Sequence, residues 1–227
     1  MITGRPPSTL SPDSGRLSSP DAPSIASLLT LAAPPAAPTP LLGPRRFACS
    51  LPSVLSAAEA ASLIAATEAL GYTPALLNMG GGREALRPDV RDSTRCIVDS
   101  PALADALFAR LRHALPPLLH GLRLLGMNER LRFLRYGPGQ QFRAHRDGPF
   151  ARGAAVTLVT VLLYLNEGYE GFTTFYPDEG VEGVPPGGLE VVPTPGLALL
   201  LDHALLHAAP PLRSGVKYVM RSDIFYG

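Results

Sequence analysis

The spacing of apolar residues predicts two helices in the first half of the chain. In the segment "LSAAEAASLIAATEALG", residues 55–71, Ser56 is placed to cap a helix and Glu59, three residues later, to complete a capping box. Gly71 then marks the end of this helix. A second helix is expected over residues 101–114, because leucines recur on one face after a capping serine and a proline. These positions are Ser100, Pro101, Leu103, Leu107, Leu111 and Leu115.

After Pro116 the pattern changes to short runs of alternating or β-branched residues, which predict strands. Turn sequences rich in Gly and Pro separate these runs by short distances, as in antiparallel sheets. Helices followed by strands are typical of an α+β fold, here mainly β. We expect the strands to close as a sandwich or jelly roll, with the helices buttressing one sheet. The expected strands lie within residues 130–136, 155–165, 171–176, 189–194, 196–201 and 216–226.

Residues 1–45 differ in composition from the rest of the chain, since Pro, Ser, Ala and Thr dominate them. We expect a disordered leader, because such a segment buries too little apolar surface to fold. A targeting peptide is the alternative, but acidic residues and the lack of one unbroken apolar block disfavour it. The folded domain is then expected over residues 46–227, with helical support in 46–120 and a jelly-roll core in 121–227.

Composition narrows the possible functions. The chain has 227 residues, of which 46% are hydrophobic and 17% charged, enough to bury the core of one domain. A net charge of +1, with Lys and Arg dispersed, argues against binding to nucleic acid or an anionic membrane. Cys49 and Cys96 lack metal-ligand spacing, and we assign them no function. No apolar run approaches the roughly 20 residues of a membrane span, so we expect a soluble, cytoplasmic protein.

The candidate chemistry begins in "YGPGQQFRAHRDGPF", residues 136–150. In an extended segment His145 and Asp147 point to the same side, so the pair directs an imidazole and a carboxylate at one point. Two histidines and one carboxylate on one face suffice to hold ferrous iron in non-haem oxygenases, leaving the other positions open. A distal histidine is therefore required, and His203 and His207 are both placed near the junction of a buried strand and a turn.

A cation downstream favours one of these histidines. A 2-oxoacid chelated to iron leaves a remote carboxylate, which needs a buried cation. Lys217 stands ten residues after His207, inside an expected strand, whereas Arg213 stands ten residues after His203 in a turn facing water. We favour His207 with Lys217. Arg221 shares the strand face of Lys217 and is an alternative anchor, although pairing with an acidic residue, Asp223 or Glu190, is the favoured role for it.

These motifs together resemble the prolyl 4-hydroxylase branch of the iron(II)- and 2-oxoglutarate-dependent dioxygenases. The matching patterns are Y-x-P-G-Q-x-F-x-x-H-x-D, Y-L-N, G-x-T-x-F and a lysine ten residues after a histidine, within residues 47–227. The resemblance implies a double-stranded β-helix, a jelly-roll or cupin-like barrel. It also implies iron ligation by His145, Asp147 and His207, and 2-oxoglutarate binding by Lys217, Tyr136, Tyr164 and Thr174.

The resemblance further implies an enzyme that hydroxylates an unactivated C–H bond of a peptidyl or amino-acid substrate and releases succinate and CO2. Its cofactor would be Fe(II), its cosubstrates 2-oxoglutarate and O2, and its reductant L-ascorbate. Two alternatives are a non-catalytic jelly-roll module that keeps a metal for structure and a zinc-water hydrolase. Both are disfavoured because neither needs a cation for a 2-oxoacid carboxylate. Substrate identity and oligomeric state stay open.

Two regions concern the substrate. The G-G-E-T pattern of the family reads "GFTT" here, so Phe172 changes the wall beside the substrate. The segment "NMGGGREALRPDVRDSTRC", residues 78–96, has the composition of a lid, in which Arg91 or Arg95 would bind a substrate carboxylate. The alternative for this segment is a solvated loop whose arginines form surface ion pairs.

Overall fold

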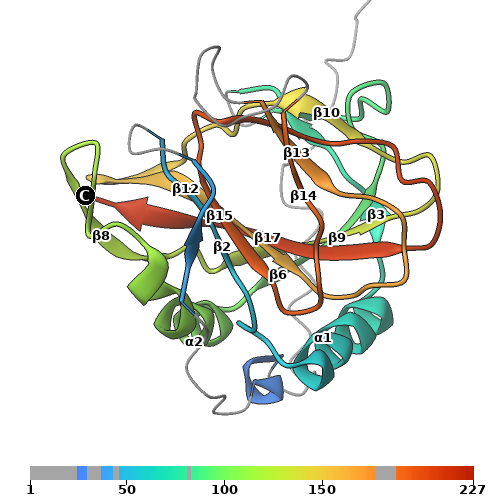
Figure 1. The fold of residues 1–227 in the computed structure, drawn as a ribbon, viewed down its shortest axis with the longest axis horizontal. Helices are drawn as coiled ribbons and strands as arrows, with labels where there is room; N and C mark the ends of the chain where they lie inside the picture. Colours follow the sequence, from blue (N-terminus) through green and yellow to red (C-terminus); the bar gives the residue numbers. More distant parts are fainter. Residues whose placement is uncertain (1–24, 30–36, 43–45, 81–82, 177–187) are drawn as a thin grey trace, which may run out of the picture.

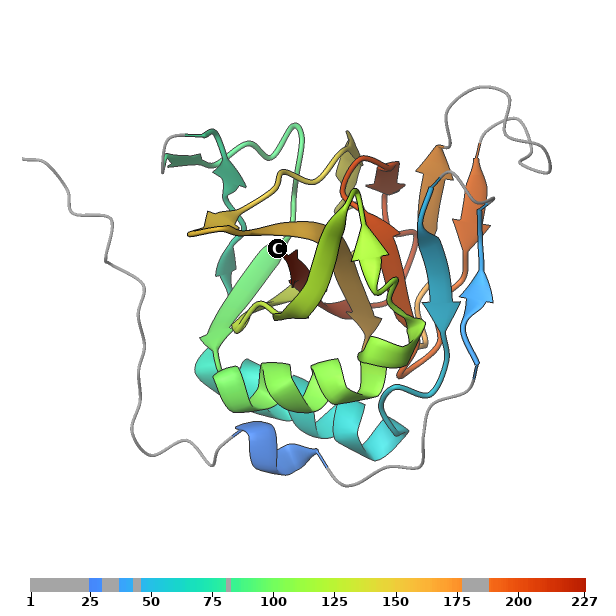
Figure 2. The same cartoon turned by 90° about the vertical axis from the view of Figure 1, so that its left-hand side faces the viewer.

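The computed structural model describes residues 25–29, 37–42, 46–80, 83–176 and 188–227, and it describes the backbone alone for 174–176. Two helices lie on one side of a large sheet, and a smaller sheet lies on the other side (Figures 1 and 2). The fold is thus mainly β with helical support, as expected. The elements are η1 Ile25–Leu28, β1 Thr39–Pro40, β2 Ala48–Leu51, α1 Ala57–Leu70, β3 Thr73–Pro74, β4 Leu77–Asn78, β5 Glu84–Ala85, β6 Thr94–Asp99, α2 Pro101–Leu111, η2 Arg112–Ala114, β7 Leu118–Leu119, β8 Leu122–Met127, β9 Arg130–Tyr136, β10 Phe142–His145, β11 Ala151–Arg152, β12 Ala155–Tyr164, β13 Thr173–Tyr176, β14 Leu189–Val191, β15 Ala198–Asp202, β16 Leu206–Ala209 and β17 Lys217–Tyr226.

Local signals define both helices. At the start of α1 the Glu59 amide donates to Ser56 Oγ at 3.2 Å, and the Ser56 amide donates to Glu59 Oε2 at 2.8 Å, which completes the expected capping box. Gly71 ends the helix with φ of 88°, a left-handed value that glycine adopts without steric cost. Helix α2 begins after the Ser100 cap and continues as η2 to Ala114, so both predicted helices are confirmed.

The large sheet has the strand order β1-β2-β15-β12-β17-β9-β6-β3, with β7, β8 and β11 attached at its sides. The smaller sheet has the order β10-β16-β13-β14, and β4 pairs with β5 in a separate hairpin. Every ladder is antiparallel, as the turn spacing predicted. The expected barrel closure is not found, because no ladder joins the two sheets in the described part of the chain.

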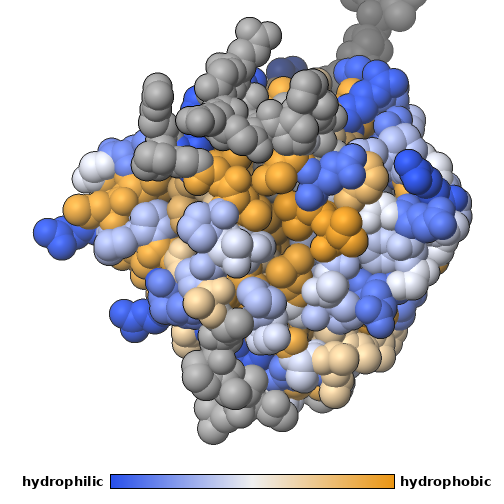
Figure 3. Space-filling view, in the orientation of Figure 1, coloured by the Kyte–Doolittle hydropathy of each residue, from blue (hydrophilic) through white to orange (hydrophobic). Residues whose placement is uncertain are grey.

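Each face of the large sheet has its own core. On the face toward the helices, alternate residues of β12, Val159, Val161 and Leu163, pack against leucines of α1 and α2. On the opposite face, Leu134, Tyr164 and Val219 pack against residues near or in the small sheet. The second core therefore lies between the two sheets. On the face seen in Figure 3, hydrophobic residues spread across the middle of the molecule and hydrophilic residues gather at its edges.

The N-terminal third contributes more to the sheet than the sequence indicated. Strands β2 and β6 lie within the region expected to be helical support, yet β2 pairs with β15 and β6 pairs with β9. Part of the expected leader also packs on the domain, since Ile25 of η1 is buried in the core beneath the helices. Most of the leader lies outside the described residues. None of the described helices has the length and apolar character needed to cross a membrane.

Candidate metal and cosubstrate site

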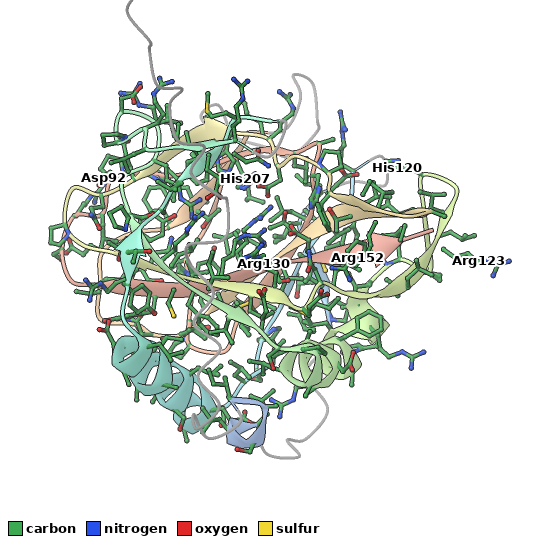
Figure 4. All side chains as sticks on the ribbon, turned by 180° about the vertical axis from the view of Figure 1, so that it is seen from behind. Asp92, His120, Arg123, Arg130, Arg152 and His207 are labelled. Atoms are coloured by element: carbon green, nitrogen blue, oxygen red, sulfur yellow. The ribbon has the colours of Figure 1, made fainter. Side chains whose placement is uncertain are left out.

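Three potential metal ligands converge between the sheets. In the antiparallel pair of β10 and β16, His145 stands directly opposite His207, which places both imidazoles on the same side. Asp147 follows two residues after His145. Its Oδ1 lies 3.8 Å from His145 Nε2, and its Oδ2 lies 3.6 Å from His207 Nε2. All three ligand atoms lie within 4.8 Å of one another. Figure 4 shows His207 toward the interior of the molecule, whereas Arg123 projects from its edge.

The backbone fixes the tautomer of both histidines. The Nδ1 atom of His145 lies 2.8 Å from the Arg143 carbonyl, and Nδ1 of His207 lies 3.0 Å from the Leu205 carbonyl. A carbonyl oxygen only accepts hydrogen bonds, so each Nδ1 carries a proton, and each Nε2 faces Asp147 as the potential ligand atom. Such hydrogen bonds orient histidines that bind metals. Burial and the neighbouring His207 also lower the pKa of His145 to about 4, which keeps it neutral.

Asp147 is held as an ionised carboxylate. Thr160 donates to its Oδ2 at 2.5 Å, and Arg221 Nη2 lies 3.0 Å from its Oδ1. The Asp147 amide donates to the His203 carbonyl at 3.1 Å, which anchors the backbone. Burial alone would raise the pKa of Asp147, but the Arg221 guanidinium and the hydrogen bond from Thr160 hold it well below its ordinary value. Two imidazoles and one carboxylate are a donor set suited to Fe(II).

Sequence reasoning missed the contact between Arg221 and Asp147. It favoured pairing of Arg221 with an acidic residue, and the structure shows a 2.9 Å contact between Arg221 Nη2 and Asp223 Oδ1. The same guanidinium thus bridges Asp223 and Asp147. His203, the competing ligand candidate, is buried behind this network with its Nε2 3.4 Å from Asp223 Oδ1, and it does not join the three converging residues. Arg213, the cation that stands ten residues after His203, is exposed, as expected.

Lys217 lies in the interior over two tyrosine rings. Its side chain is only 4% exposed, and its Nζ lies 5.7 Å from the ring centre of Tyr136 and 5.4 Å from that of Tyr164. The Tyr164 hydroxyl hydrogen-bonds with Thr173 Oγ1 at 2.5 Å. Burial lowers the pKa of Lys217 to about 8. The backbone of Thr174 lies in β13, but its side chain lies outside the described part of the structure. A small pocket beside Lys217 is lined by Tyr136, Gln140, Gly171, Phe172, Ala209, Pro210 and Leu212.

The three residues expected at the substrate take different positions. Arg91 is buried, with its Cζ 4.8 Å from the ring centre of Phe142, and Phe142 stacks on His145 at 3.6 Å. Arg95 instead forms a two-contact ion pair with Glu84 of the β4–β5 hairpin, at 2.8 Å and 3.1 Å. Phe172 lines the Lys217 pocket. The structure therefore places Arg91 over the Phe142 ring that stacks on His145, whereas Arg95 is occupied by a neighbouring acid.

Comparisons with known proteins agree with this site. Residues 131–222 match the family model of the 2OG-Fe(II) oxygenase superfamily. Similar solved structures include a prolyl hydroxylase from Trichoplax adhaerens in complex with a hypoxia inducible factor oxygen degradation domain peptide fragment, with a TM-score of 0.61, 18% identity and coverage of 78% of this chain and 83% of that one. A Pseudomonas putida prolyl-4-hydroxylase has a TM-score of 0.59 at 21% identity, over 79% of this chain and 92% of that one.

The viral collagen prolyl hydroxylase of Paramecium Bursaria Chlorella virus-1, in its 2OG complex, has a TM-score of 0.56 at 23% identity, over 79% of this chain and 96% of that one. No curated protein sequence matches this chain. At these identities the structural likeness establishes the fold, and the family match covers the segment that carries His145, Asp147, His207 and Lys217. The resemblance seen in the sequence is confirmed: residues 131–222 match the model of the 2OG-Fe(II) oxygenase superfamily, and the chain has the fold of solved prolyl hydroxylases.

Proposed function

We propose that the chain is an Fe(II)- and 2-oxoglutarate-dependent dioxygenase that hydroxylates an unactivated C–H bond and releases succinate and CO2. The observation that carries this proposal is the convergence of three ligand atoms in a 2OG oxygenase fold that also buries Lys217 without a described acidic partner. We also propose that the two sheets form the double-stranded β-helix of that fold. Its catalytic domain would span residues 46–227.

In this proposal His145, Asp147 and His207 hold the iron. Both histidines are already oriented through their Nδ1 hydrogen bonds, which leave Nε2 as the ligand atom, so metal binding requires no change of orientation. Thr160 and Arg221 restrict the rotation of the Asp147 carboxylate. Iron with 2-oxoglutarate and O2 supplies the oxidising power when bound, and ascorbate would keep the metal reduced. The protein supplies orientation and excludes water.

Lys217 is proposed to bind the remote carboxylate of 2-oxoglutarate. No described acidic residue pairs with its ammonium, which rests over the faces of Tyr136 and Tyr164. An anion entering this pocket gains a charge-assisted hydrogen bond in surroundings of low polarity. Tyr136, Tyr164 and Thr174 are proposed to line the cosubstrate, and Phe172 to form part of the adjoining wall.

The proposed substrate is a peptide or an amino acid, most simply at proline. The Trichoplax adhaerens neighbour is a prolyl hydroxylase in complex with a peptide fragment, which supports a peptide as one form of substrate. Arg91 is the residue best placed to contact it. Arg95 would contribute only if the Arg95–Glu84 pair opened, since that pair uses both of its terminal nitrogens.

The alternative is a non-catalytic module that keeps a metal for structure. A structural metal site needs its ligands but has no use for a buried lysine without a carboxylate partner, and burying that ammonium is costly. The burial of Lys217 without a described carboxylate partner therefore favours an enzyme over a structural metal module.

Succinate formation from 2-oxoglutarate tests the proposal. The protein with Fe(II), ascorbate and a pool of peptides and amino acids should form succinate, and His145→Ala and Asp147→Ala should each abolish it. His113→Ala, which removes an exposed histidine of η2, is the matched control and should retain turnover. Wild-type levels of succinate from both ligand variants would refute the assignment, and metal binding without any 2-oxoglutarate turnover would favour the structural module.

A further inference from the structure

The pairing of strand β10 directs Arg91 into the site. Arg91 stands opposite Phe142 in an antiparallel bridge. The Asp92 amide donates to the Gln141 carbonyl and the Arg143 amide to the Val90 carbonyl, both at 2.9 Å. Residues directly opposite in such a pair point to the same side. Because the Phe142 ring packs against the core between the sheets and stacks on His145, the Arg91 side chain lies on the side of the metal ligands.

The Arg91 guanidinium is buried without an acidic partner. The residue is 8% exposed, and its polar contacts are with hydroxyl groups: Nε donates to Ser93 Oγ at 3.3 Å, and Tyr136 also interacts with it. Among the described residues no carboxylate lies within ion-pair distance of it, although Arg95, four residues away, has Glu84. A buried charge that is hydrogen-bonded but unpaired is unfavourable unless a ligand completes it.

Positive charge is in excess over the whole inner face. Arg132 and Arg221 stand directly opposite each other on β9 and β17, an arrangement that is unfavourable for like charges. Both share Asp223, whose Oδ2 lies 3.5 Å from Arg132 Nη1. The described cations of this region are Arg91, Arg132, Lys217 and Arg221. The carboxylates that contact them are Asp147, which pairs with Arg221, and Asp223, which Arg132 and Arg221 share.

Binding of iron and 2-oxoglutarate leaves this excess of positive charge unchanged. Iron(II) and the 2-oxoglutarate dianion carry equal and opposite charges, so their binding together adds no net charge. Lys217 is then matched by the remote carboxylate of the cosubstrate, but Arg91 is not. The remaining positive charge is available to the second substrate, which must enter beside the ligands to be oxidised.

From these contacts we propose that the substrate is anionic and that Arg91 binds a carboxylate of it next to the metal. This inference rests on the proposed function and deepens it by naming the substrate class: an amino acid or peptide with a free carboxylate near the carbon that is hydroxylated. The carboxylate belongs either to the α-carboxyl group or to an Asp or Glu side chain. A guanidinium stacked on Phe142 presents its nitrogens in a plane suited to a carboxylate.

Acetate and acetamide, which have nearly the same shape, test the anion site. The protein loaded with Mn(II), which replaces iron without turnover, and saturated with 2-oxoglutarate is melted by calorimetry with either probe at equal ionic strength. Acetate should raise the Tm and acetamide should not, because a ligand that binds only the folded state stabilises it. Arg91→Gln should abolish the acetate effect. Arg152→Gln, which removes an arginine near Phe150 that is paired with Glu129, is the matched control and should retain it.

Arg91→Lys keeps the charge, and it should retain a reduced acetate effect even if Arg91→Gln fails to fold. Equal effects of acetate and acetamide on the wild type, or an acetate effect that survives in Arg91→Gln, would overturn the inference. If Arg91→Gln instead loses binding of 2-oxoglutarate, the carboxylate that Arg91 binds is that of the cosubstrate, which also overturns it.

Mass spectrometry then separates the two sources of the carboxylate. The iron-loaded enzyme is incubated with free amino acids, with their carboxamides, and with C-terminally amidated peptides that contain internal Asp or Glu. Free amino acids or acidic peptides should gain one oxygen, and carboxamides should not. Hydroxylation of the carboxamides at the same rate refutes the inference and leaves the proposed function standing. Absence of succinate in every pool, with the acetate effect intact, refutes the proposed function and leaves the anion site standing.

Discussion

Replacing Lys217 by methionine should stabilise the ligand-free protein while weakening its binding of 2-oxoglutarate. Burial lowers the pKa of Lys217 from its ordinary value of 10.5 to about 8. Since one pKa unit corresponds to about 1.4 kcal/mol, holding this ammonium charged at pH 7 costs the folded state about 3 kcal/mol. Contacts with the Tyr136 and Tyr164 rings return about 0.5–2 kcal/mol. Methionine fills a similar volume without charge, so the free energy of unfolding should rise by about 1–3 kcal/mol.

The pH dependence of this gain has a definite sign. A lysine whose pKa is lower in the folded state destabilises that state fully below the folded value, and the penalty fades as the pH rises from about 8 to 10.5. The difference in unfolding free energy between Lys217→Met and the wild type should therefore be large at pH 7 and small above pH 10. Urea denaturation followed by circular dichroism at both pH values measures it. A variant that is less stable at pH 7, or a difference independent of pH, would refute the reasoning.

The same substitution should act oppositely on binding. Removing one partner of a buried charge pair costs about 2–5 kcal/mol, so the Kd for 2-oxoglutarate should rise about 30-fold or more. The Kd for Mn(II), measured by calorimetry without cosubstrate, should change much less, because Lys217 is not among the converging ligands. Equal losses of metal and cosubstrate affinity would show that Lys217 supports the fold of the site rather than the cosubstrate.

Further predictions follow from named contacts. Arg221→Met should weaken Mn(II) binding about 10–100-fold, because Asp147 loses the group that orients it, and Arg221→Lys should retain more affinity. An unchanged affinity for Mn(II), measured by calorimetry in both variants, would contradict this. Gly196→Ala should lower the free energy of unfolding by more than about 2 kcal/mol, because φ is 79° and a Cβ would lie 2.0 Å from the Leu55 carbonyl oxygen. Gly71→Ala should lower it by only about 1 kcal/mol, because φ is 88° there but the space around the Cβ is open. Ser56→Ala should cost about 1 kcal/mol through loss of the helix cap, and a value near zero in urea denaturation would show that the capping box adds nothing.

The features that sequence reasoning anticipated depend on neighbours in the chain. Ser56, Glu59 and Gly71 define a helix within seventeen residues, and the alternation of β17 places Lys217 and Arg221 on one face. The pair His145 and Asp147 follows from the same two-residue period. Such signals require no knowledge of how distant segments pack, which is why both helices and the main strands were predicted.

The features that were missed depend on contacts between distant segments. The ion pair of Arg221 with Asp147 joins β17 to the segment after β10, and no local pattern sets that distance. Glu84 engages Arg95 only because the β4–β5 hairpin lies near β6. Strand β6 did carry a signal, the β-branched residues Thr94, Ile97 and Val98, but the expected lid over residues 78–96 included its first half and no strand was predicted there. Strand β2 has only four residues, too few for a periodic pattern.

The buried cations give the site an excess of positive charge. Lys217 rests over two tyrosine rings and Arg91 rests over Phe142, and neither has a described carboxylate partner. Arg132 and Arg221 stand opposite each other and share Asp223. A site arranged for stability alone would replace these residues with apolar ones. Burying these charges destabilises the ligand-free protein, and each bound carboxylate removes part of that cost. Anionic ligands therefore bind more tightly than neutral analogues of the same shape. Selectivity for carboxylates then follows from charges already present in the fold, before any contact specific to one substrate is made.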